Sequence, residues 1–303
     1  MNLGTRLKAD LTLLLVAAIW GSAFVAQRVA AAHIGTFLFT GVRFLLGALV
    51  LLPLVRFRPK LDRRTWPWAA GAGLLMSGGS VLQQAGLRWT TAGNAGFITG
   101  LYVVFVPILL FILWRQRVRP TVWVGACLAA GGLFLLSAGG QLRLAAGDGL
   151  ELAGAVLWAG HIIVVDKAMR RMEALPFAIG QNLVTGGLLL AVGLALEANT
   201  APGLVAAWWT VVYTGILSVA VAYTLQGVAQ KHAPPADAAL IVSLEAVFAA
   251  VSGYLWLGER LRPEQLAGAG LIMAAIVLAQ LAPRASEPAR AAPDVTTDRA
   301  AEG

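Results

Sequence analysis

The sequence predicts an all-α integral membrane protein with ten transmembrane helices, arranged as two inverted five-helix repeats. Three observations support this prediction. Hydrophobic residues make up 58% of the 303-residue chain, and charged residues only 13%, whereas soluble domains carry roughly 25% charged residues. The apolar residues gather into ten stretches long enough to cross a bilayer, for which a helix needs about 20 residues. The second half of the chain also repeats the first.

Each expected helix is a predominantly apolar stretch, bounded by short polar, basic or Pro-containing segments. The ten stretches cover about 10–31, 36–55, 66–87, 93–114, 121–139, 149–169, 175–196, 205–228, 236–257 and 264–282. The first stretch is too long for the apolar core of a signal peptide and carries Trp20, so we expect it to remain as a membrane helix. The short connections leave no room for a large domain outside the membrane.

The internal repeat is clearest after the second stretch. Moving Trp66–Leu128 forward by 143 positions places Pro120 on Pro263 without a gap, and identical residues also meet at Trp66/Trp209, Gln83/Gln226, Leu101/Leu244 and Gly125/Gly268. Upstream the shift becomes 138, where Trp20 meets Trp158. Five crossings per copy insert the two copies upside down relative to each other, as in many transporters. We therefore divide the chain into repeats at 1–140 and 149–282 and a disordered cytoplasmic tail at 283–303.

Basic residues mark the orientation of the chain. Apart from Arg43, only five of the 23 Lys and Arg residues fall on the side opposite the N-terminus, namely Arg28, Arg88, Arg143, Arg260 and Arg262. Because basic residues collect on the cytoplasmic side of membrane proteins, we expect both termini in the cytoplasm and a multi-pass protein of the cell (plasma or inner) membrane. The net charge of +8 then reflects topology and lipid contact, and no nucleic-acid partner is expected.

Two charged residues lie deep within expected spans, away from their ends, where an ionisable side chain needs a partner or a function. Glu245 falls near the centre of the ninth stretch, and its repeat counterpart is Tyr102. It is a candidate proton carrier or binder of a cationic group, with a static hydrogen bond as the alternative. Arg43 lies in the second stretch, and its repeat counterpart is Asn182. We interpret Arg43 either as a structural anchor or as a binder of a substrate carboxylate.

Aromatic and amide side chains outline a candidate substrate cavity. Trp20 and Gln27 share one face of the first stretch, and Trp158 precedes His161 by about one turn in the sixth. The third stretch contributes Ser80 and Gln84, and the eighth contributes Tyr223 and Gln226. These residues predict either cavity walls or contacts between helices. Asn94 and Asp237, another repeat pair, are interpreted as N-caps of the fourth and ninth helices.

Several segments resemble a known family. They are AAIWGSAFVAQR in the first stretch, GVRFLLGALVLL in the second, AGNAGFITGLYVVFVPIL in the fourth and SLEAVFAAVSGYLWLGERLRPEQLAGAGLIMAA across the ninth and tenth. They are similar to the EamA family of the drug/metabolite transporter superfamily, over about residues 10–282. The resemblance implies a ten-helix carrier of inverted repeats, and most such proteins are bacterial exporters of amino acids and other metabolites.

The chain departs from the family pattern in two places. Ala246 stands where the family usually has Pro after the Glu of the ninth helix, and Pro107 lies four residues beyond the matching position in the fourth. We therefore expect the helix breaks to differ between the repeats. Gln116 replaces, in the first repeat, the Glu present as Glu259 in the second. Glu259 and Arg262 are interpreted as packing and capping residues.

The leading functional interpretation is a secondary transporter with alternating access that exports small metabolites, such as amino acids or amphipathic compounds, through a central cavity. Proton coupling and homodimer formation stay open. A nucleotide-sugar or phosphorylated-sugar antiporter is the alternative, although phosphate recognition normally needs more basic residues than Arg43 alone. An enzyme is not expected, because His33, His161 and His232 are scattered and form no catalytic cluster. The single cysteine, Cys127, supplies no common metal spacing, and no metal or cofactor is expected.

Overall fold

The computed structural model describes residues 3–55, 63, 65–138, 146–197, 201–260 and 262–281, and the expected tail at 283–303 lies outside this part. Helices are the only regular secondary structure of the described residues, and they form ten helical rods joined by short turns and loops. The first repeat holds α1 (Leu3–His33), α2 (Thr36–Leu51) continued by η1 (Leu52–Val55), α3 (Trp66–Gly86), α4 (Ala92–Gly100) with α5 (Tyr102–Trp114), and α6 (Pro120–Ala138). The second holds α7 (Asp148–Met169), α8 (Ala174–Leu196), a rod of α10 (Trp208–Tyr213), η2 (Thr214–Ala222) and α11 (Tyr223–Gln230) preceded by α9 (Ala201–Ala206), then α12 (Pro235–Val242) with α13 (Glu245–Leu257), and α14 (Pro263–Leu281).

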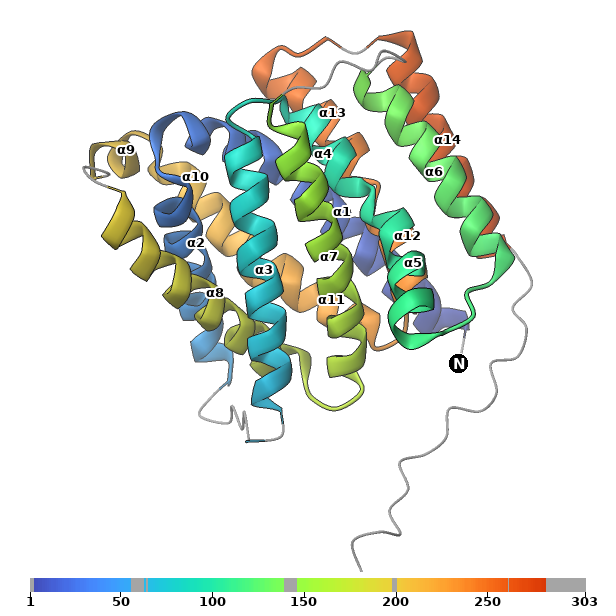
Figure 1. The fold of residues 1–303 in the computed structure, drawn as a ribbon, viewed down its shortest axis with the longest axis horizontal. Coiled ribbons are helices and arrows are strands. Elements are labelled where there is room, and N and C mark those ends of the chain that lie inside the picture. The colour runs from blue at the N-terminus through green and yellow to red at the C-terminus, as the bar shows by residue number, and fades with distance from the viewer. Residues whose placement is uncertain are drawn as a thin grey trace, which may run out of the picture.

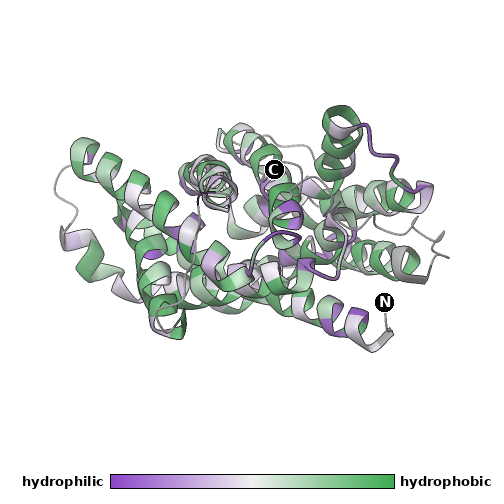
Figure 2. Ribbon diagram, turned by 90° about the horizontal axis from the view of Figure 1, so that it is seen from below, coloured by the Kyte–Doolittle hydropathy of each residue, from purple (hydrophilic) through white to green (hydrophobic). Residues whose placement is uncertain are grey.

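The expected all-α membrane fold is confirmed. Seven rods are long and apolar enough to cross a membrane by length and composition, and two more, Pro120–Leu136 and Pro263–Leu278, are shorter apolar helices. The remaining rod, α3, carries serines and glutamines that lower its apolarity but are buried inside the protein. Large apolar side chains such as Leu74, Phe111, Leu194 and Trp256 are exposed on the outside of the bundle, and the helices are mostly hydrophobic along their length (Figure 2).

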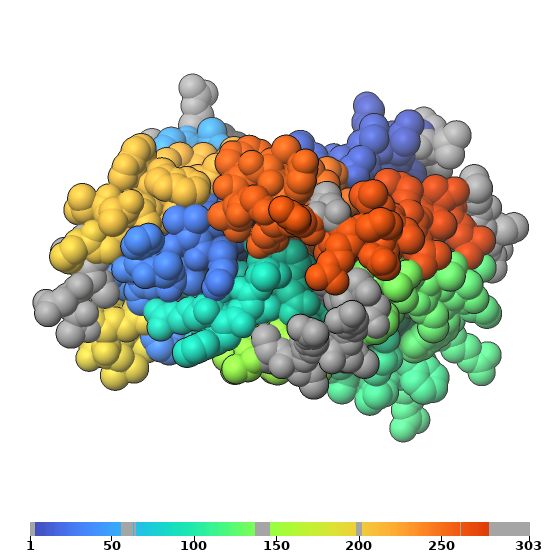
Figure 3. Space-filling model, turned by 90° about the horizontal axis from the view of Figure 1, so that it is seen from above, coloured from blue at the N-terminus to red at the C-terminus, as the bar shows by residue number. Residues whose placement is uncertain are grey.

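Helix packing follows the two-fold relation between the repeats. Counterpart helices pack on each other at two places, α2 against α8 and α6 against α14, and the second pair forms one edge of the molecule (Figure 1). The contact of α3 with α8 has its counterpart in the contact of η2 with α2. Seen from above, segments of the first repeat lie between segments of the second (Figure 3). The repeats therefore interdigitate around a shared centre.

The contact between α6 and α14 depends on glycine. A Cβ atom at Gly132 would lie 2.7 Å from the carbonyl oxygen of Gly268 and 2.8 Å from Cγ1 of Ile272. Such close approach of two backbones is typical of helix pairs in membranes, where van der Waals contact replaces the hydrophobic effect as the main attraction.

The fourth and ninth rods are broken at equivalent positions, and our expectation of different breaks is wrong. The α4 helix gives way to α5 at Leu101, and α12 gives way to α13 at Ser243 and Leu244. Of these four helices only α5 has a proline in its interior, Pro107, since Pro235 stands at the start of α12. At both breaks the backbone makes i→i−3 hydrogen bonds, Leu101 N to Ile98 O at 3.1 Å and Leu244 N to Ile241 O at 3.2 Å. Local tightening of the backbone therefore makes the break without proline.

The α10–η2–α11 rod is irregular in a different way. Its middle section, Thr214–Ala222, is a π-helix of nine residues, whereas its repeat counterpart α3 is α-helical throughout Trp66–Gly86. Extended π-helices are rare, and π-type turns occur frequently at functional sites. This irregular section passes beside the central pocket.

Candidate functional site

A pocket lies at the centre of the bundle, where the two repeats meet. Its cavity volume is about 40 Å³, well below the roughly 300–1,000 Å³ of typical small-molecule sites, so the pocket is small in this conformation. Both repeats contribute to the wall, which consists of Trp20, Phe24, Gln27, Arg43, Gln83, Thr99, Tyr102, Trp158, His161, Ile162, Ser218, Tyr223, Gln226 and Glu245. The pocket therefore combines an aromatic surface with amides and two side chains of opposite charge.

Three aromatic rings form one wall of this pocket. Tyr223 on α11 lies between the two repeat-related tryptophans, with ring centroids 4.8 Å from Trp20 and 6.2 Å from Trp158. The rings of Trp158 and Tyr223 are nearly parallel, at an interplanar angle of 20°. Such a wall can pack against an apolar side chain and can attract a cation through the ring faces.

Hydrogen bonds fix the two tryptophans. Trp20 donates its indole N–H to the carbonyl oxygen of Ser218 in the π-helix at 3.0 Å. Trp158 donates to Oε1 of Gln83 at 3.0 Å, and Gln83 in turn donates to Oε1 of Gln27 at 3.1 Å. Because each indole N–H has a hydrogen-bond partner, the two rings are held in place.

The breaks in the fourth and ninth rods bring Tyr102 and Glu245 to the pocket. Each is the first residue after its break, at the start of α5 and α13, and the side chains interact in the lining of the pocket. Both residues are almost fully buried. Within the described residues, neither the Tyr102 hydroxyl nor Oε1 of Glu245 makes a hydrogen bond of standard geometry. Apart from their interaction with each other, these two polar atoms therefore have no hydrogen-bond partner among the described residues.

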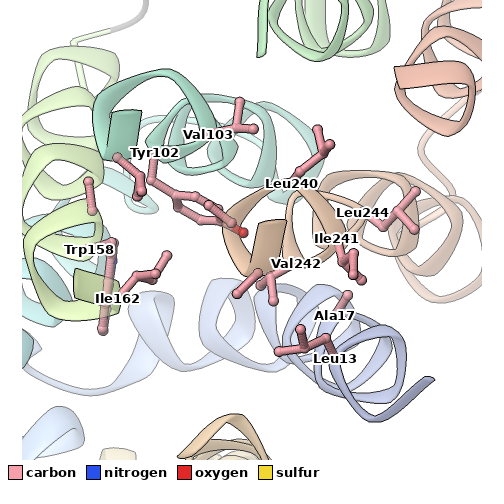
Figure 4. Packing of buried hydrophobic residues seen from close by; sticks show 14 of the residues in the cluster. Leu13, Ala17, Tyr102, Val103, Trp158, Ile162, Leu240, Ile241, Val242 and Leu244 are labelled. Carbon is pink, nitrogen blue, oxygen red and sulfur yellow. The ribbon is translucent and has the colours of Figure 1, made fainter. Parts of the chain in front are cut away.

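The Tyr102 side chain also borders the apolar core. Side chains of α1, α5, α7 and α12 converge there, and the Tyr102 ring points toward the α12 segment that ends at Val242 (Figure 4). Leu13 and Ala17 of α1 pack on the same cluster. The cluster includes residues of both α1 and α12, and we call the end of the molecule at which these two helices begin the α1–α12 end.

Arg43 is the only basic residue in the pocket wall. Its side chain on α2 is 3% exposed, and the guanidinium carbon lies 5.2 Å from the ring centre of Phe39 and 5.1 Å from that of Phe44. Within the described residues it makes no ion pair, and its Nε atom has no hydrogen-bond partner. A buried guanidinium needs an anion, carbonyl groups or water. Arg43 can therefore donate hydrogen bonds to an anionic group that enters the pocket.

His161 lies in the wall but is already paired. Its Nε2 atom lies 3.0 Å from Oε1 of Gln181 on α8, and its ring makes edge contacts with Trp158 and Tyr223, with centroids 5.8 Å from each. These contacts match the ordinary role of a hydrogen-bonded core histidine, which positions the aromatic wall.

The structure brings together most of the residues that we selected from the sequence. Trp20, Gln27, Arg43, Tyr102, Trp158, His161, Tyr223, Gln226 and Glu245 all line the pocket. Ser80 and Gln84 do not belong to its wall. Both are wholly buried in α3, and Gln84 donates to the backbone carbonyl of Gln27 at 3.0 Å, so this residue holds α3 against α1. Sequence reasoning did not select Thr99, Ile162 or Ser218, which complete the wall together with Phe24 and Gln83.

The N-cap interpretation is wrong for Asp237 and Asn94. Asp237 accepts charged hydrogen bonds from Arg6 at 2.7 Å and Arg119 at 3.0 Å, which ties α12 to α1 and to the start of α6 at the α1–α12 end. Asn94 follows the true N-cap Thr91, and its side chain donates to Asp148 on α7 at 2.8 Å. Long-range contacts compete with local capping at both positions, and each contact closes one end of the molecule.

Glu259 caps a helix in the other repeat. Its carboxylate accepts hydrogen bonds from the backbone N–H groups of Ala92 and Gly93, at the start of α4. This contact lies at the end where α4 and α7 begin, which we call the α4–α7 end (upper in Figure 1). It agrees with the interpretation of Glu259 as a capping residue.

Comparison with known proteins places the chain among transporters. The sequence profile of the EamA-like transporter family matches residues 7–138 and again 145–281. An uncharacterized transporter of Archaeoglobus fulgidus is 32% identical over 282 residues, 91% of this chain and 87% of the relative. The threonine/homoserine exporter RhtA of Escherichia coli K12 is 29% identical over 78% of this chain and 79% of its own.

Two further similarities extend this result. A probable terminal-alkyne amino-acid exporter of Streptantibioticus cattleyicolor is 27% identical over 89% of this chain and 93% of the relative. A protein of known crystal structure superposes with a TM-score of 0.75 at 19% identity, covering 90% of this chain and 96% of the other. At this sequence identity, the similarity to the crystal structure supports the fold alone.

Proposed function

The chain belongs to the EamA-like transporter family, and we propose that it is a secondary exporter of small zwitterionic metabolites of the amino-acid class. Its relatives are transporters, which implies a role in transport rather than catalysis. The cargo would bind in the central pocket while the repeats rock about it and expose it to either side in turn. We place the α1–α12 end in the cytoplasm, from the distribution of basic residues.

One observation supports this substrate class above others. Arg43 and Glu245 line the same pocket, carry opposite charges when ionised, and form no ion pair with each other or with another described residue, although Glu245 interacts with Tyr102. An amino acid presents a carboxylate to the guanidinium and an ammonium group to the carboxylate, so one small solute can satisfy both. The aromatic wall of Trp20, Tyr223 and Trp158 is then left for the side chain of the solute.

The names of the relatives point in the same direction. One is a threonine/homoserine exporter and another a probable amino-acid exporter. By contrast, a nucleotide sugar carries two phosphates, and Arg43 is the only cation in the wall. The pocket therefore favours a zwitterion over the phosphorylated-sugar alternative.

The test is flux and binding with purified protein in liposomes, using a panel of labelled amino acids that includes threonine and homoserine. For each cargo, binding is also measured for an amine analogue that lacks the carboxyl group and for a hydroxy acid that lacks the amino group. Wild-type protein should prefer the amino acid to both analogues. Excess nucleotide sugar should leave the flux unchanged.

Two variants make the assignment specific to each charge. Arg43→Gln should weaken amino-acid binding by about tenfold or more, since a hydrogen bond to a charged group contributes roughly 1.5–3 kcal/mol, while leaving the amine analogue little affected. Glu245→Gln should show the reverse selectivity and spare the hydroxy acid. If both variants weaken the two analogues equally, the charges do not recognise the ends of a zwitterion and the proposal fails.

A further inference from the structure

A second carboxyl group is buried in the membrane region, and the pocket does not include it. Glu151 lies near the start of α7 with a side chain that is 0% exposed. Its Oε2 atom lies 3.2 Å from the hydroxyl of Thr99, and its Oε1 atom has no hydrogen-bond partner. No cation among the described residues forms an ion pair with it. A carboxylate in such surroundings is costly, so burial favours a carboxyl group that holds its proton.

The neighbouring helix leaves room for this carboxyl group. Gly86 is the last residue of α3, and a Cβ atom there would lie 2.7 Å from Oε1 of Glu151 and 2.9 Å from its Cγ atom. Any larger residue would displace the carboxyl group from its place beside Thr99. The side chain therefore occupies a fitted site.

Polar side chains lie between Glu151 and the pocket on one side and near Glu151 toward the α4–α7 end on the other. Thr99 contacts Glu151 and also lines the pocket, close in sequence to Tyr102, which faces Glu245. In the opposite direction, Asp148 precedes Glu151 by about one turn of α7 and accepts a hydrogen bond from Asn94 at 2.8 Å. Glu151 thus lies between the pocket carboxyl and the polar residues at this end.

Within the part of the chain that the structure describes, no positive charge balances Glu151. The charged groups that act on it are both acidic, Asp148 on its own helix and Glu245 on α13. Of the helices that pack on α7, α3 and α4 carry no titratable side chain, α5 carries Tyr102 and α11 carries Tyr223. The α12 helix carries Asp237, which is paired with Arg6 at the α1–α12 end. Two acids that share one polar path favour a single mobile proton between them.

We propose that Glu151 is a proton-binding site that exchanges protons with the α4–α7 end and passes them to Glu245 through the hydroxyls of Thr99 and Tyr102. In this step the O–H bond of Glu151 breaks, each hydroxyl accepts one proton and gives up its own, and an O–H bond forms on Glu245. A hydronium ion at the α4–α7 end then restores the proton of Glu151. Neutral Glu245 no longer holds an ammonium group, so proton entry releases the cargo. This inference rests on the proposed export of zwitterions.

The experiment compares two fluxes of labelled threonine in proteoliposomes. Accumulation driven by a pH gradient needs net proton movement, whereas exchange of labelled for unlabelled threonine does not. Glu151→Gln should abolish accumulation and keep exchange and the apparent affinity within about twofold of wild type. Glu245→Gln should also lose affinity, because it removes a ligand of the cargo. The control is Glu264→Gln, a carboxyl exposed at the start of α14, which should behave as wild type.

The possible results distinguish the proton-binding role of Glu151 from the proposed export of amino acids. Gradient-driven accumulation that persists in a folded Glu151→Gln variant overturns the inference and leaves the exporter intact. The same holds if the wild type exchanges threonine but never accumulates it. If the wild type neither accumulates nor exchanges any amino acid of the panel, the proposed function fails and the inference fails with it.

A second pair of variants covers the case in which Glu151→Gln does not fold. Thr99→Val keeps the shape of the side chain but removes the hydroxyl, and should lower the ratio of accumulation to exchange. Thr99→Ser restores the hydroxyl and should restore that ratio. An unchanged ratio in Thr99→Val shows that protons do not pass this residue and overturns the inference.

Discussion

The ion pairs at the α1–α12 end predict how strongly this end is held closed. Asp237 on α12 neutralises Arg6 on α1 and Arg119 at the start of α6. From Arg6 toward the pocket, one face of α1 carries Asp10, Leu13, Ala17 and Trp20 at helical spacing. Opening this end must separate Asp237 from Arg6, and it would expose Ala17 to water. We expect Asp237→Asn, which removes the charge but keeps the size, to favour the open state.

The size of the change in the opening equilibrium follows from how deeply the paired side chains are buried. Arg6 and Asp237 have side chains 5% and 4% exposed and approach to 2.7 Å, whereas Arg119 is 29% exposed and contributes less because water screens it. Removing one partner of a buried ion pair costs about 3–5 kcal/mol. Asn retains hydrogen bonding and Arg6 keeps Asp10 at 2.9 Å, so we adopt the lower value of about 3 kcal/mol. That corresponds to roughly a hundredfold change in the opening equilibrium.

Thiol labelling measures this equilibrium. Cys127 is the single cysteine, so a Cys127→Ser background with Ala17→Cys reports one position, which is wholly buried in the closed end. When opening is fast, the labelling rate follows the fraction of open molecules. Asp237→Asn should raise that rate by about two orders of magnitude. Asp166→Asn is the matched control, because its Arg170 partner is 49% exposed. An equal rate in folded Asp237→Asn and wild type would refute the reasoning.

Two further predictions concern helix contacts. Gly132→Val places side-chain atoms against the backbone of Gly268 and should destabilise the α6–α14 contact by about 1–3 kcal/mol. The control Gly131→Val meets nothing within 4 Å, so equal melting temperatures in detergent for both variants would contradict this account. Burial raises the pKa of Glu259 above its ordinary 4.5, so the folded state binds this proton more tightly than the unfolded chain does. The contribution of this proton to the free energy of unfolding is complete below pH 4.5. It is lost as the pH rises through the raised pKa of the folded state. Melting temperatures across that pH range should therefore fall less in Glu259→Gln than in wild type, and parallel curves would count against it.

Much of this architecture could be predicted from the sequence, because bilayer-length apolar stretches and the 143-residue shift constrain it strongly. The same symmetry placed Tyr102 opposite Glu245 and Trp20 opposite Trp158, four residues that share the pocket. Asp237 was misread because an acid in the first turn of a helix usually has a local explanation. Its real partner Arg6 lies 231 positions away in the chain, and no local pattern reveals such a contact.

Glu151 was overlooked for a related reason. It follows Asp148 by about one turn at the start of an expected helix, where acidic residues are ordinary. Only the packing of Gly86 and Thr99 against it shows that the side chain is enclosed. Ser80 and Gln84 show the opposite case, since their helical spacing matches a cavity face but the rotation of α3 directs them into contacts with other helices. Helix rotation is set by neighbouring helices.

The π-helical section of the eighth rod has a consequence for how the two sides of the membrane differ. At the 143-residue shift, Tyr223 corresponds to Ser80, yet Tyr223 stands in the pocket wall and Ser80 does not. One repeat has a widened backbone before this position, and the other has a regular α-helix. If the halves trade conformations during the cycle, a small hydroxyl would stand where the ring had been. The pocket would then offer the solute less aromatic contact surface in the conformation that releases it than in the conformation that binds it.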